Sequence, residues 1–143
     1  MSLYVVDAGV AVKWFIPEPD SGLARQSLKR YERGDDLLIA PDFFIAECAN
    51  VFWKRADRGD LTKQEAADNL NDLLSLNLSL SPSSTLAPAA LLLSQTHRKA
   101  VYDCLYLALA LANGCEFLTA DERLYYSMAT TYPQIQLLRH KTF

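Results

Sequence analysis

The sequence has no long hydrophobic run, and this absence argues against a membrane-spanning helix. A span needs about 18 or more consecutive apolar residues, whereas the densest apolar run, residues 105–112, is less than half as long. Met1 and Ser2 lead directly into a short β-branched stretch, without the basic start and apolar core of a signal peptide. We therefore expect a protein with neither a membrane anchor nor a secretory leader.

Cysteine is also scarce. The three cysteines, Cys48, Cys104 and Cys115, are odd in number, lie in largely apolar surroundings and show no CxxC spacing. This pattern argues against a disulfide framework and against a zinc site built on cysteine. It is typical of small core residues in a reduced protein, so we expect a cytoplasmic location.

Positive charge is limited too. The chain has 14 Lys and Arg residues against 17 Asp and Glu residues, a formal net charge of −3. This balance argues against a protein that coats nucleic acid by electrostatics alone, but not against an enzyme whose acidic site is offset by metal ions. With 143 residues, 50% of them hydrophobic and 22% charged, the chain is expected to form one domain over residues 1–143.

Apolar periodicity and turn residues predict short strands that alternate with helices. The strands are expected at residues 3–6, 37–40, 76–80, 115–118 and 134–138. The helices are expected at residues 9–15, 20–33, 43–58, 62–75, 85–97, 103–112 and 122–130. Strands separated by helices of this length imply a parallel sheet with helices on both faces, an α/β fold.

Capping patterns support some of these boundaries. Thr62, with Glu65 three residues later, matches a capping box. Either Asp20 or Ser21 could cap the helix that follows them. Pro88 is compatible with its helix if it lies within the first turn, where no backbone N–H donor is needed.

Four aromatic residues, Trp14, Phe15, Phe52 and Trp53, offer more aromatic surface than one helix face needs. Core packing is the first use we expect for them. A subunit interface, where aromatic side chains are enriched, is the second.

Three aspartates stand at the ends of predicted elements. Asp7 follows the first strand, Asp103 begins the most apolar helix, and Asp121 follows the fourth strand. Ligand crevices of open α/β folds lie at the carboxyl edge of the sheet, so these carboxylates could face one crevice. The alternative for Asp7 and Asp121 is helix capping, and for Asp103 it is a favourable first-turn position in the helix dipole.

Glu47 interrupts the apolar run FFIAECANVFW and shares a helix face with Phe43, Phe44 and Val51. A buried, unpaired carboxylate is costly, so it needs a cation, a metal ion or a proton. A salt bridge to Lys54, about two turns further along the helix, is the structural alternative.

Together the four carboxylates predict a metal site. Mg²⁺ and Mn²⁺ prefer oxygen ligands, and two such ions can activate water and clamp a phosphodiester during hydrolysis. Thr119, two residues before Asp121, could support the site through a hydrogen bond to a ligand carboxylate or to a metal-bound water. Arg98 and Lys99, just before Asp103, could contact RNA phosphate. A basic pair after a helix more commonly interacts with the helix dipole at the protein surface, in contact with water.

Four segments in order, YVVDAGVAVKWF, LIAPDFFIAECANVFWKR, VYDCLYLALALA and FLTADERL, resemble the PIN-domain family, specifically the VapC-type toxin ribonucleases. The resemblance implies a three-layer α/β/α sandwich with a five-stranded parallel sheet. It also implies Mg²⁺- or Mn²⁺-dependent endonucleolytic cleavage of RNA, a homodimer and a cognate antitoxin that blocks the site. The family's acidic quartet would fall on Asp7, Glu47, Asp103 and Asp121. One departure is Gly9, where many relatives carry Ser or Thr.

The alternatives belong to other classes. A non-catalytic PIN-like protein that only binds RNA or a partner is compatible with the same residues. A phosphoacceptor receiver domain needs an aspartate at the end of its third strand, where this chain has Leu80 and Ser81. A haloacid-dehalogenase-type phosphatase needs a second aspartate at the position of Gly9.

Overall fold

Five short strands form one parallel sheet at the centre of the computed structural model, which describes residues 1–143. The strands are β1 (Ser2–Val6), β2 (Asp36–Pro41), β3 (Ser79–Ser81), β4 (Glu116–Thr119) and β5 (Ile135–Leu137). Their spatial order is β3-β2-β1-β4-β5, and every neighbouring pair is parallel. The order changes direction at β1, so the gap between the carboxyl ends of β1 and β4 is the position where α/β sheets bind ligands.

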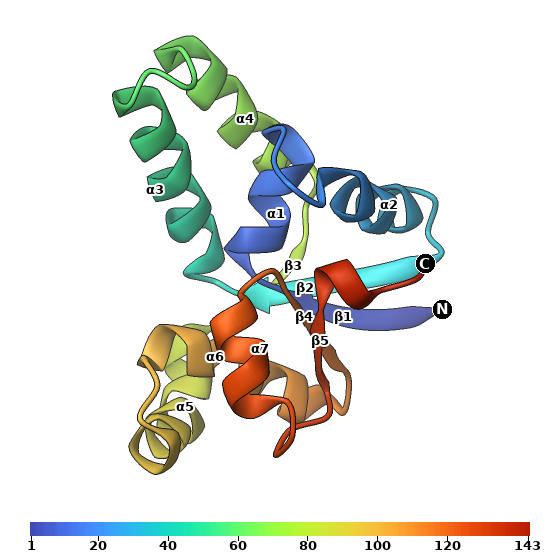
Figure 1. The fold of residues 1–143 in the computed structure, drawn as a ribbon, viewed down its shortest axis with the longest axis vertical. Coiled ribbons are helices and arrows are strands. Elements are labelled where there is room, and N and C mark those ends of the chain that lie inside the picture. The colour runs from blue at the N-terminus through green and yellow to red at the C-terminus, as the bar shows by residue number, and fades with distance from the viewer.

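Seven helices connect the strands. They are α1 (Ala8–Phe15), α2 (Ser21–Glu32), α3 (Phe44–Asp57), α4 (Lys63–Ser75), α5 (Ser83–His97), α6 (Val101–Asn113) and α7 (Glu122–Met128). Figure 1 shows α1 to α4 on one face of the sheet and α5 to α7 on the other. This arrangement confirms the predicted three-layer α/β/α sandwich with a five-stranded parallel sheet.

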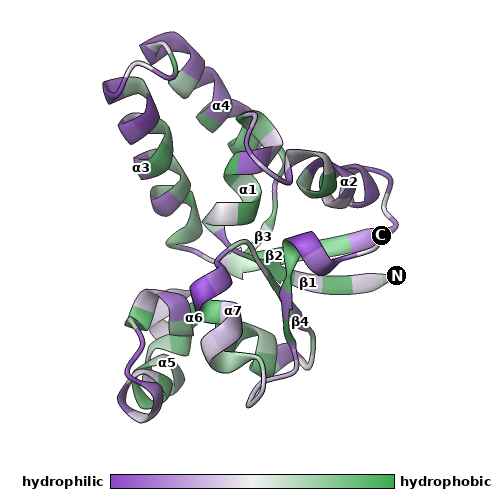
Figure 2. Cartoon of the chain, in the orientation of Figure 1, coloured by the Kyte–Doolittle hydropathy of each residue, from purple (hydrophilic) through white to green (hydrophobic).

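The core lies between the sheet and the two helical layers. Parallel strands covered on both faces need continuous apolar sequence, and Val5, Val6, Phe117 and Leu118 are fully buried at the centre of the sheet. The all-apolar run of α6 is buried over residues 104–110. Figure 2 shows that α4 and the outer face of α3 are hydrophilic, because this helical pair extends away from the sheet.

The third strand differs from its prediction. Alternation over residues 76–80 predicted a strand there, but Leu76 ends α4 and Asn77 has a left-handed backbone, with φ of 51°. Extended pairing with β2 begins only at Ser79. The leucine alternation therefore marks the end of a helix and the start of a short edge strand.

Two expectations about helix starts are also wrong. Asp20 has a left-handed backbone and makes no capping hydrogen bond, and the Ser21 hydroxyl instead accepts from Glu18 N and donates to Ile16 O. Pro88 is the sixth residue of α5 rather than part of its first turn. The helix tolerates it because Pro88 and Ser84, whose carbonyl loses its partner, are both exposed, so water can bind that carbonyl.

Most other local predictions are confirmed, but core packing is wrong for Trp53. Thr62 and Glu65 form the capping box at the start of α4. Trp14 and Phe52 are buried, whereas Trp53 is 59% exposed and therefore does not serve the core. All three cysteines are free, with Cys48 and Cys104 buried and Cys115 half-buried. None of the helices is both long enough and apolar enough to cross a membrane.

Candidate active site

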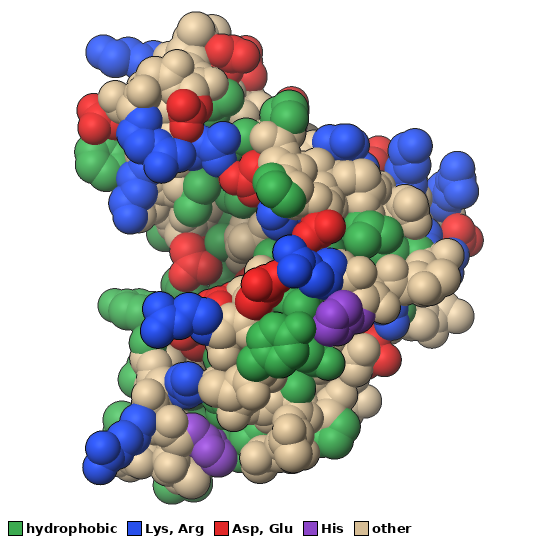
Figure 3. Space-filling view, in the orientation of Figure 1, with side chains coloured by type: hydrophobic (Ala, Val, Ile, Leu, Met, Phe, Trp, Pro, Cys, Tyr) green, Lys and Arg blue, Asp and Glu red, His purple; other side chains and the backbone are tan.

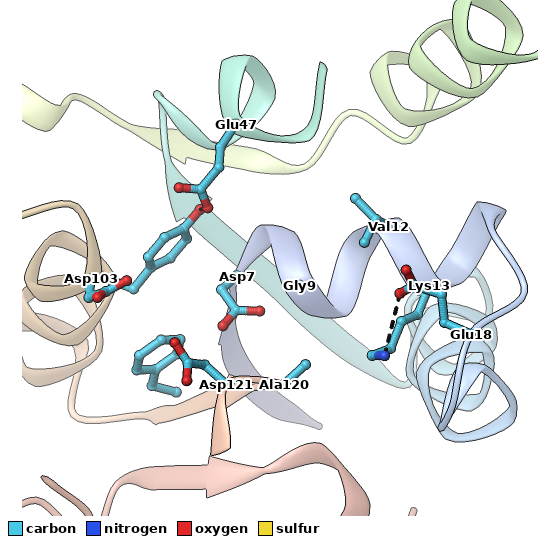
Figure 4. Close-up of a pocket in the computed structure, with 11 residues that line it drawn as sticks. Asp7, Gly9, Val12, Lys13, Glu18, Glu47, Asp103, Ala120 and Asp121 are labelled. Carbon is cyan, nitrogen blue, oxygen red and sulfur yellow. Dashed lines mark hydrogen bonds and ion pairs between the residues drawn. The ribbon is translucent and has the colours of Figure 1, made fainter. Parts of the chain in front are cut away.

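The four predicted carboxylates line one cavity beside the carboxyl ends of β1 and β4. The cavity has a volume of about 380 Å³. Its other lining residues are Gly9, Val12, Lys13, Glu18, Tyr106, Phe117 and Ala120. Figure 4 shows Glu47, Asp103 and Asp121 around Asp7, with Lys13 and Glu18 at the far side, and Figure 3 shows carboxylates in the hollow between α3 and the α5–α6 pair.

Asp7 is held in place by two hydrogen bonds. One carboxylate oxygen, Oδ1, accepts from Val10 N at 2.9 Å and so caps α1. The other, Oδ2, accepts from the Thr119 hydroxyl. Asp7 is also only 8% exposed. Because it caps α1 and also lines the cavity, both hypotheses for this residue hold.

Thr119 connects the first and last acids of the group. It is the last residue of β4 and fully buried. Its hydroxyl donates to Asp7 Oδ2 and accepts from Asp121 N at 3.0 Å. Asp121 in turn caps α7, because its Oδ1 accepts from Leu124 N at 3.1 Å.

Glu47 faces the cavity from the first turn of α3. Its Oε1 accepts a hydrogen bond from the hydroxyl of Tyr106, on α6, at 3.0 Å. No ion pair joins Glu47 to Lys54, so the salt-bridge alternative is wrong. The partner that the chain provides for this carboxylate is a neutral donor, which leaves the charge of Glu47 uncompensated.

Asp103 occupies the third position of α6, where the helix dipole favours an acid. Its carboxylate makes no hydrogen bond within the chain, and it lines the cavity opposite Lys13. Both of its oxygens are therefore available to water or to an added ligand.

Burial and mutual repulsion raise the pKa of three of these acids. The pKa of Asp7 rises to about 7, mainly because the group is buried, and the charges of Glu47 and Asp121 add to the rise. Burial also raises the pKa of Glu47 and of Asp103, and Asp103 and Asp121, respectively, raise them further. The four carboxylates thus act on one another within one site, and a nearby cation would relieve their repulsion.

The donor set of the cavity suits a hard divalent cation. Four carboxylates supply oxygen ligands, and Lys13 is the only lysine or arginine side chain on the cavity wall. No three acidic, histidine or cysteine side chains are placed to ligate a single ion directly. Mg²⁺ fits such a site because it keeps several waters and binds through one or two carboxylates. One or two of the carboxylates would then bind the ion directly, and the others would bind it through water molecules in the same cavity.

The sequence offered some candidates that the structure places elsewhere, and missed others. Arg98 and Lys99 lie in the turn between α5 and α6 and do not line the cavity, although the charge of Lys99 lowers the pKa of Asp103. Tyr106, Lys13 and Glu18 do line it. The sequence did not single out Tyr106 as a site residue, because it lies within the apolar run of α6, which is typical of core packing.

Gly9 lies close to the first acid. A Cβ atom at this position would be 3.3 Å from Asp7 Oδ1 and 3.4 Å from the Ala120 Cβ. Both contacts are tight, and the Asp7 carboxylate is held by Val10 and Thr119. Any side chain at position 9 would therefore press directly on the Asp7 carboxylate.

Sequence comparison finds similarity to known proteins over most of the chain. The family model described as the PIN domain matches residues 4–128. Ribonuclease VapC3 of Pyrobaculum aerophilum is 33% identical over 122 residues, which cover 84% of this chain and 90% of that protein.

Two solved structures share the fold. PAE2754 of Pyrobaculum aerophilum superposes with a TM-score of 0.72 at 22% identity, over 97% of this chain and 85% of that one. A chain of the VapBC2 complex of Rickettsia felis, bound to a DNA fragment from its promoter, superposes with a TM-score of 0.64 at 15% identity. That match covers 94% of this chain and 96% of that one.

Proposed function

The chain belongs to the PIN-domain family, and from this premise we propose that it is a metal-dependent endoribonuclease, the toxin of a toxin–antitoxin pair. The observation that carries the proposal is the single cavity lined by Asp7, Glu47, Asp103 and Asp121 at the sheet's switch point. The 33% identical relative is named a ribonuclease, which supports RNA as the substrate.

The four acids are proposed as both metal-binding and catalytic residues. Mg²⁺ or Mn²⁺ held by them would supply Lewis-acid activation of water and of the phosphodiester. Asp7 is fixed by Val10 N and the Thr119 hydroxyl, so its position is set before substrate binds. Tyr106 orients Glu47. Asp103, whose oxygens have no partner in the chain, is the acid best able to orient the attacking water.

An antitoxin is the proposed protein partner, and a groove between α3 and α4 suits it. The groove has a volume of about 310 Å³ and is lined by Phe52, Trp53, Leu70 and several alanines, with Lys63 at its edge. Trp53 is 59% exposed there. Exposed apolar surface of this kind is typical of protein interfaces, and the solved VapBC2 structure contains a relative together with its partner.

A homodimer is proposed as the oligomeric state. Leu91 and Leu92, on α5, are 50% and 65% exposed, and Tyr102, at the start of α6, is 64% exposed. A second copy of the chain would cover these exposed apolar side chains. We further propose a cytoplasmic location, where three free cysteines remain reduced.

Cleavage of a labelled total-RNA pool tests the central proposal. The wild type, Asp7→Asn and Asp103→Asn are compared in Mg²⁺, in Mn²⁺ and in EDTA. Discrete fragments that need the metal and disappear in both variants are the expected result. The conservative Asn substitutions keep side-chain volume, and Asn also preserves the cap of α1.

Two other results separate the competing functions. Metal binding and RNA binding without cleavage, tested on RNA pools from several sources, would favour the non-catalytic PIN-like alternative. Cleavage that persists in EDTA and in both Asn variants would show that these acids are not the active site. Isothermal titration of Mn²⁺ into the same three proteins reports metal binding independently of turnover.

A further inference from the structure

Lys13 is the one basic residue that lines the acidic cavity. It lies in the last turn of α1, the helix that Asp7 caps. Figure 4 shows it on the side of the cavity opposite Glu47 and Asp103. Within the cavity, Lys13 is therefore the only cationic side chain able to meet the negative charge of a substrate.

The loop after α1 fixes the Lys13 amino group. Lys13 Nζ donates to the Pro19 carbonyl at 2.8 Å and to Glu18 Oε1 at 3.4 Å. The Lys13 side chain is only 13% exposed and the Glu18 side chain 21%. A lysine ammonium has three N–H donors, so one remains after these two contacts.

Glu18 does not fully neutralise the charge of Lys13, because it also pairs with a second cation. Its second oxygen pairs with Arg55, on α3, so two cations share one carboxylate. Arg55 also pairs with Asp60, which Arg58 shares, so three cations meet two carboxylates. Lys13 thus keeps positive charge that a phosphate could use, in a position fixed by the loop after α1.

A second cavity begins where the first one ends. It has a volume of about 310 Å³, and Lys13 and Ala120 line both cavities. Its lining also includes Arg139, which is paired with two acids of the same cavity, Asp20 and Glu122. The second cavity therefore adjoins the acidic cavity at Lys13, since the two share two lining residues.

We propose that Lys13 binds a non-bridging oxygen of an RNA phosphate next to the cleaved bond, and that the adjoining cavity takes the nucleotide on that side. This inference rests on the proposed ribonuclease function and adds a specific substrate contact to it. The acids repel phosphate wherever no cation intervenes. A lysine at the junction of the two cavities relieves that repulsion for the phosphate that enters next.

The competing explanation is purely structural, with Lys13 serving only to tie the Pro17–Pro19 loop to α1. Three variants separate the two. Lys13→Ala removes the charge and the loop contacts, Lys13→Arg keeps a cation, and Lys29→Ala removes an exposed lysine of α2 outside both cavities. Each is assayed for kcat and KM on a defined RNA that the wild type cleaves, and for Tm.

A charge-assisted hydrogen bond to phosphate leads us to expect a roughly 10- to 100-fold rise in KM for Lys13→Ala. Lys13→Arg should recover a large part of that loss, whereas Lys29→Ala should change KM less than about 2-fold. Binding of Mn²⁺ should be retained in all three, because the four acids are intact. A structural role alone would instead lower Tm without a specific change in KM.

Neutral phosphate analogues make the test independent of folding losses. The phosphates flanking the cleaved bond are replaced one at a time by methylphosphonate. In the wild type, one replacement should raise KM by about as much as Lys13→Ala does, and in Lys13→Ala the same replacement should add little. If Lys13→Ala itself fails to fold, Lys13→Gln takes its place.

Additive effects at every flanking phosphate would overturn the inference. So would an unchanged KM in Lys13→Ala. Either result leaves the proposed function standing, because the wild type still cleaves the RNA. Failure of the proposed function would appear earlier, as absence of metal-dependent cleavage by the wild type.

Discussion

Replacing Asp7 by asparagine should stabilise the metal-free protein at neutral pH while abolishing cleavage. Asparagine has nearly the same volume and caps helices as well as aspartate does, so the bond from Val10 N is kept. The amide nitrogen then takes the place of Oδ2 and donates to the Thr119 hydroxyl, so that hydrogen bond is kept with its direction reversed. Apart from this reversal, the change removes a buried negative charge near Glu47 and Asp121.

The magnitude follows from the pKa of Asp7, which burial raises from its ordinary value of 3.8 to about 7. One pKa unit corresponds to about 1.4 kcal/mol, so the full rise sets an upper limit of about 4 kcal/mol on the destabilisation by ionised Asp7. Mutual repulsion with the other acids makes this group part of a coupled set, and we expect a gain of about 1 to 4 kcal/mol for the variant.

The pH dependence has a definite sign. Between about pH 4 and pH 7, the folded state keeps the Asp7 proton while the unfolded state has lost it, so the wild type loses stability as the pH rises. Below this window both states are protonated, and above it both are ionised and the full penalty applies. Asp7→Asn lacks this contribution. The free energy of unfolding of Asp7→Asn should therefore exceed that of the wild type by an amount that grows from pH 4 to pH 7 and then stays constant.

Thermal and urea unfolding in EDTA at pH 5 and pH 8 measure the effect. A gain of 1 kcal/mol raises the Tm of a domain of this size by about 3 °C. Asp72→Asn, an exposed acid of α4, is the matched control and should show no such difference. Added Mg²⁺ should stabilise the wild type more than Asp7→Asn, because ligand binding to the folded state adds to stability.

An Asp7→Asn variant that is no more stable than the wild type at pH 8, and whose stability has the same pH profile, would contradict this prediction. That result would mean that Asp7 is not an ionised, desolvated carboxylate in the folded protein. Asp7→Ala distinguishes charge removal from cap loss, since it also removes the cap, at about 1 kcal/mol, and leaves the Thr119 hydroxyl without this acceptor.

Three further substitutions test the surroundings of the acids. Tyr106→Phe should lower cleavage about 10-fold or more with little loss of Tm, because it removes only the hydroxyl that orients Glu47; unchanged cleavage would show that Glu47 needs no orientation. Thr119→Val should cost about 1 to 3 kcal/mol in urea unfolding, because Asp121 N and Asp7 lose a buried partner, and an unchanged midpoint would contradict this. Gly9→Ala should gain roughly 0.5 to 1 kcal/mol of helix propensity, and the 3.3 Å contact between the new Cβ and Asp7 Oδ1 should offset this gain. We therefore expect a reduced cleavage rate at a nearly constant Tm. Full activity would mean that the Asp7 carboxylate can shift freely.

Local patterns were enough to predict the order of strands and helices and to single out the four acids that line one cavity, whose catalytic role stays a prediction. The strands are apolar runs bounded by turn residues; Asp7 directly follows β1, and Asp121 lies two residues after the end of β4. The third strand was mispredicted because the alternation of its leucines does not reveal the left-handed backbone of Asn77. That conformation depends on how α4 ends and not on the polarity pattern.

Among the supporting residues, the sequence predicted Thr119 as a hydrogen-bond partner of a ligand carboxylate but not which one, and it did not predict Tyr106, because these contacts join distant parts of the chain. Tyr106 and Glu47 are 59 positions apart and meet only when α6 packs across the sheet from α3. Thr119 and Asp7 are separated by 112 positions and are brought together by the pairing of β1 with β4. Neither contact leaves a periodic signal in the sequence.

The capping and functional explanations for Asp7 and Asp121 turn out to be compatible, because a carboxylate has two oxygens. Each residue uses one oxygen to cap a helix, and this task requires no charge, since asparagine or serine would perform it equally well. At Asp7 the charge adds a desolvation cost that a neutral cap would avoid. Capping therefore explains why a polar residue stands at position 7, but it does not explain why that residue is an acid. A cation that binds the cavity does explain it, and the gain in stability expected of Asp7→Asn is the measure of what the acid costs without one.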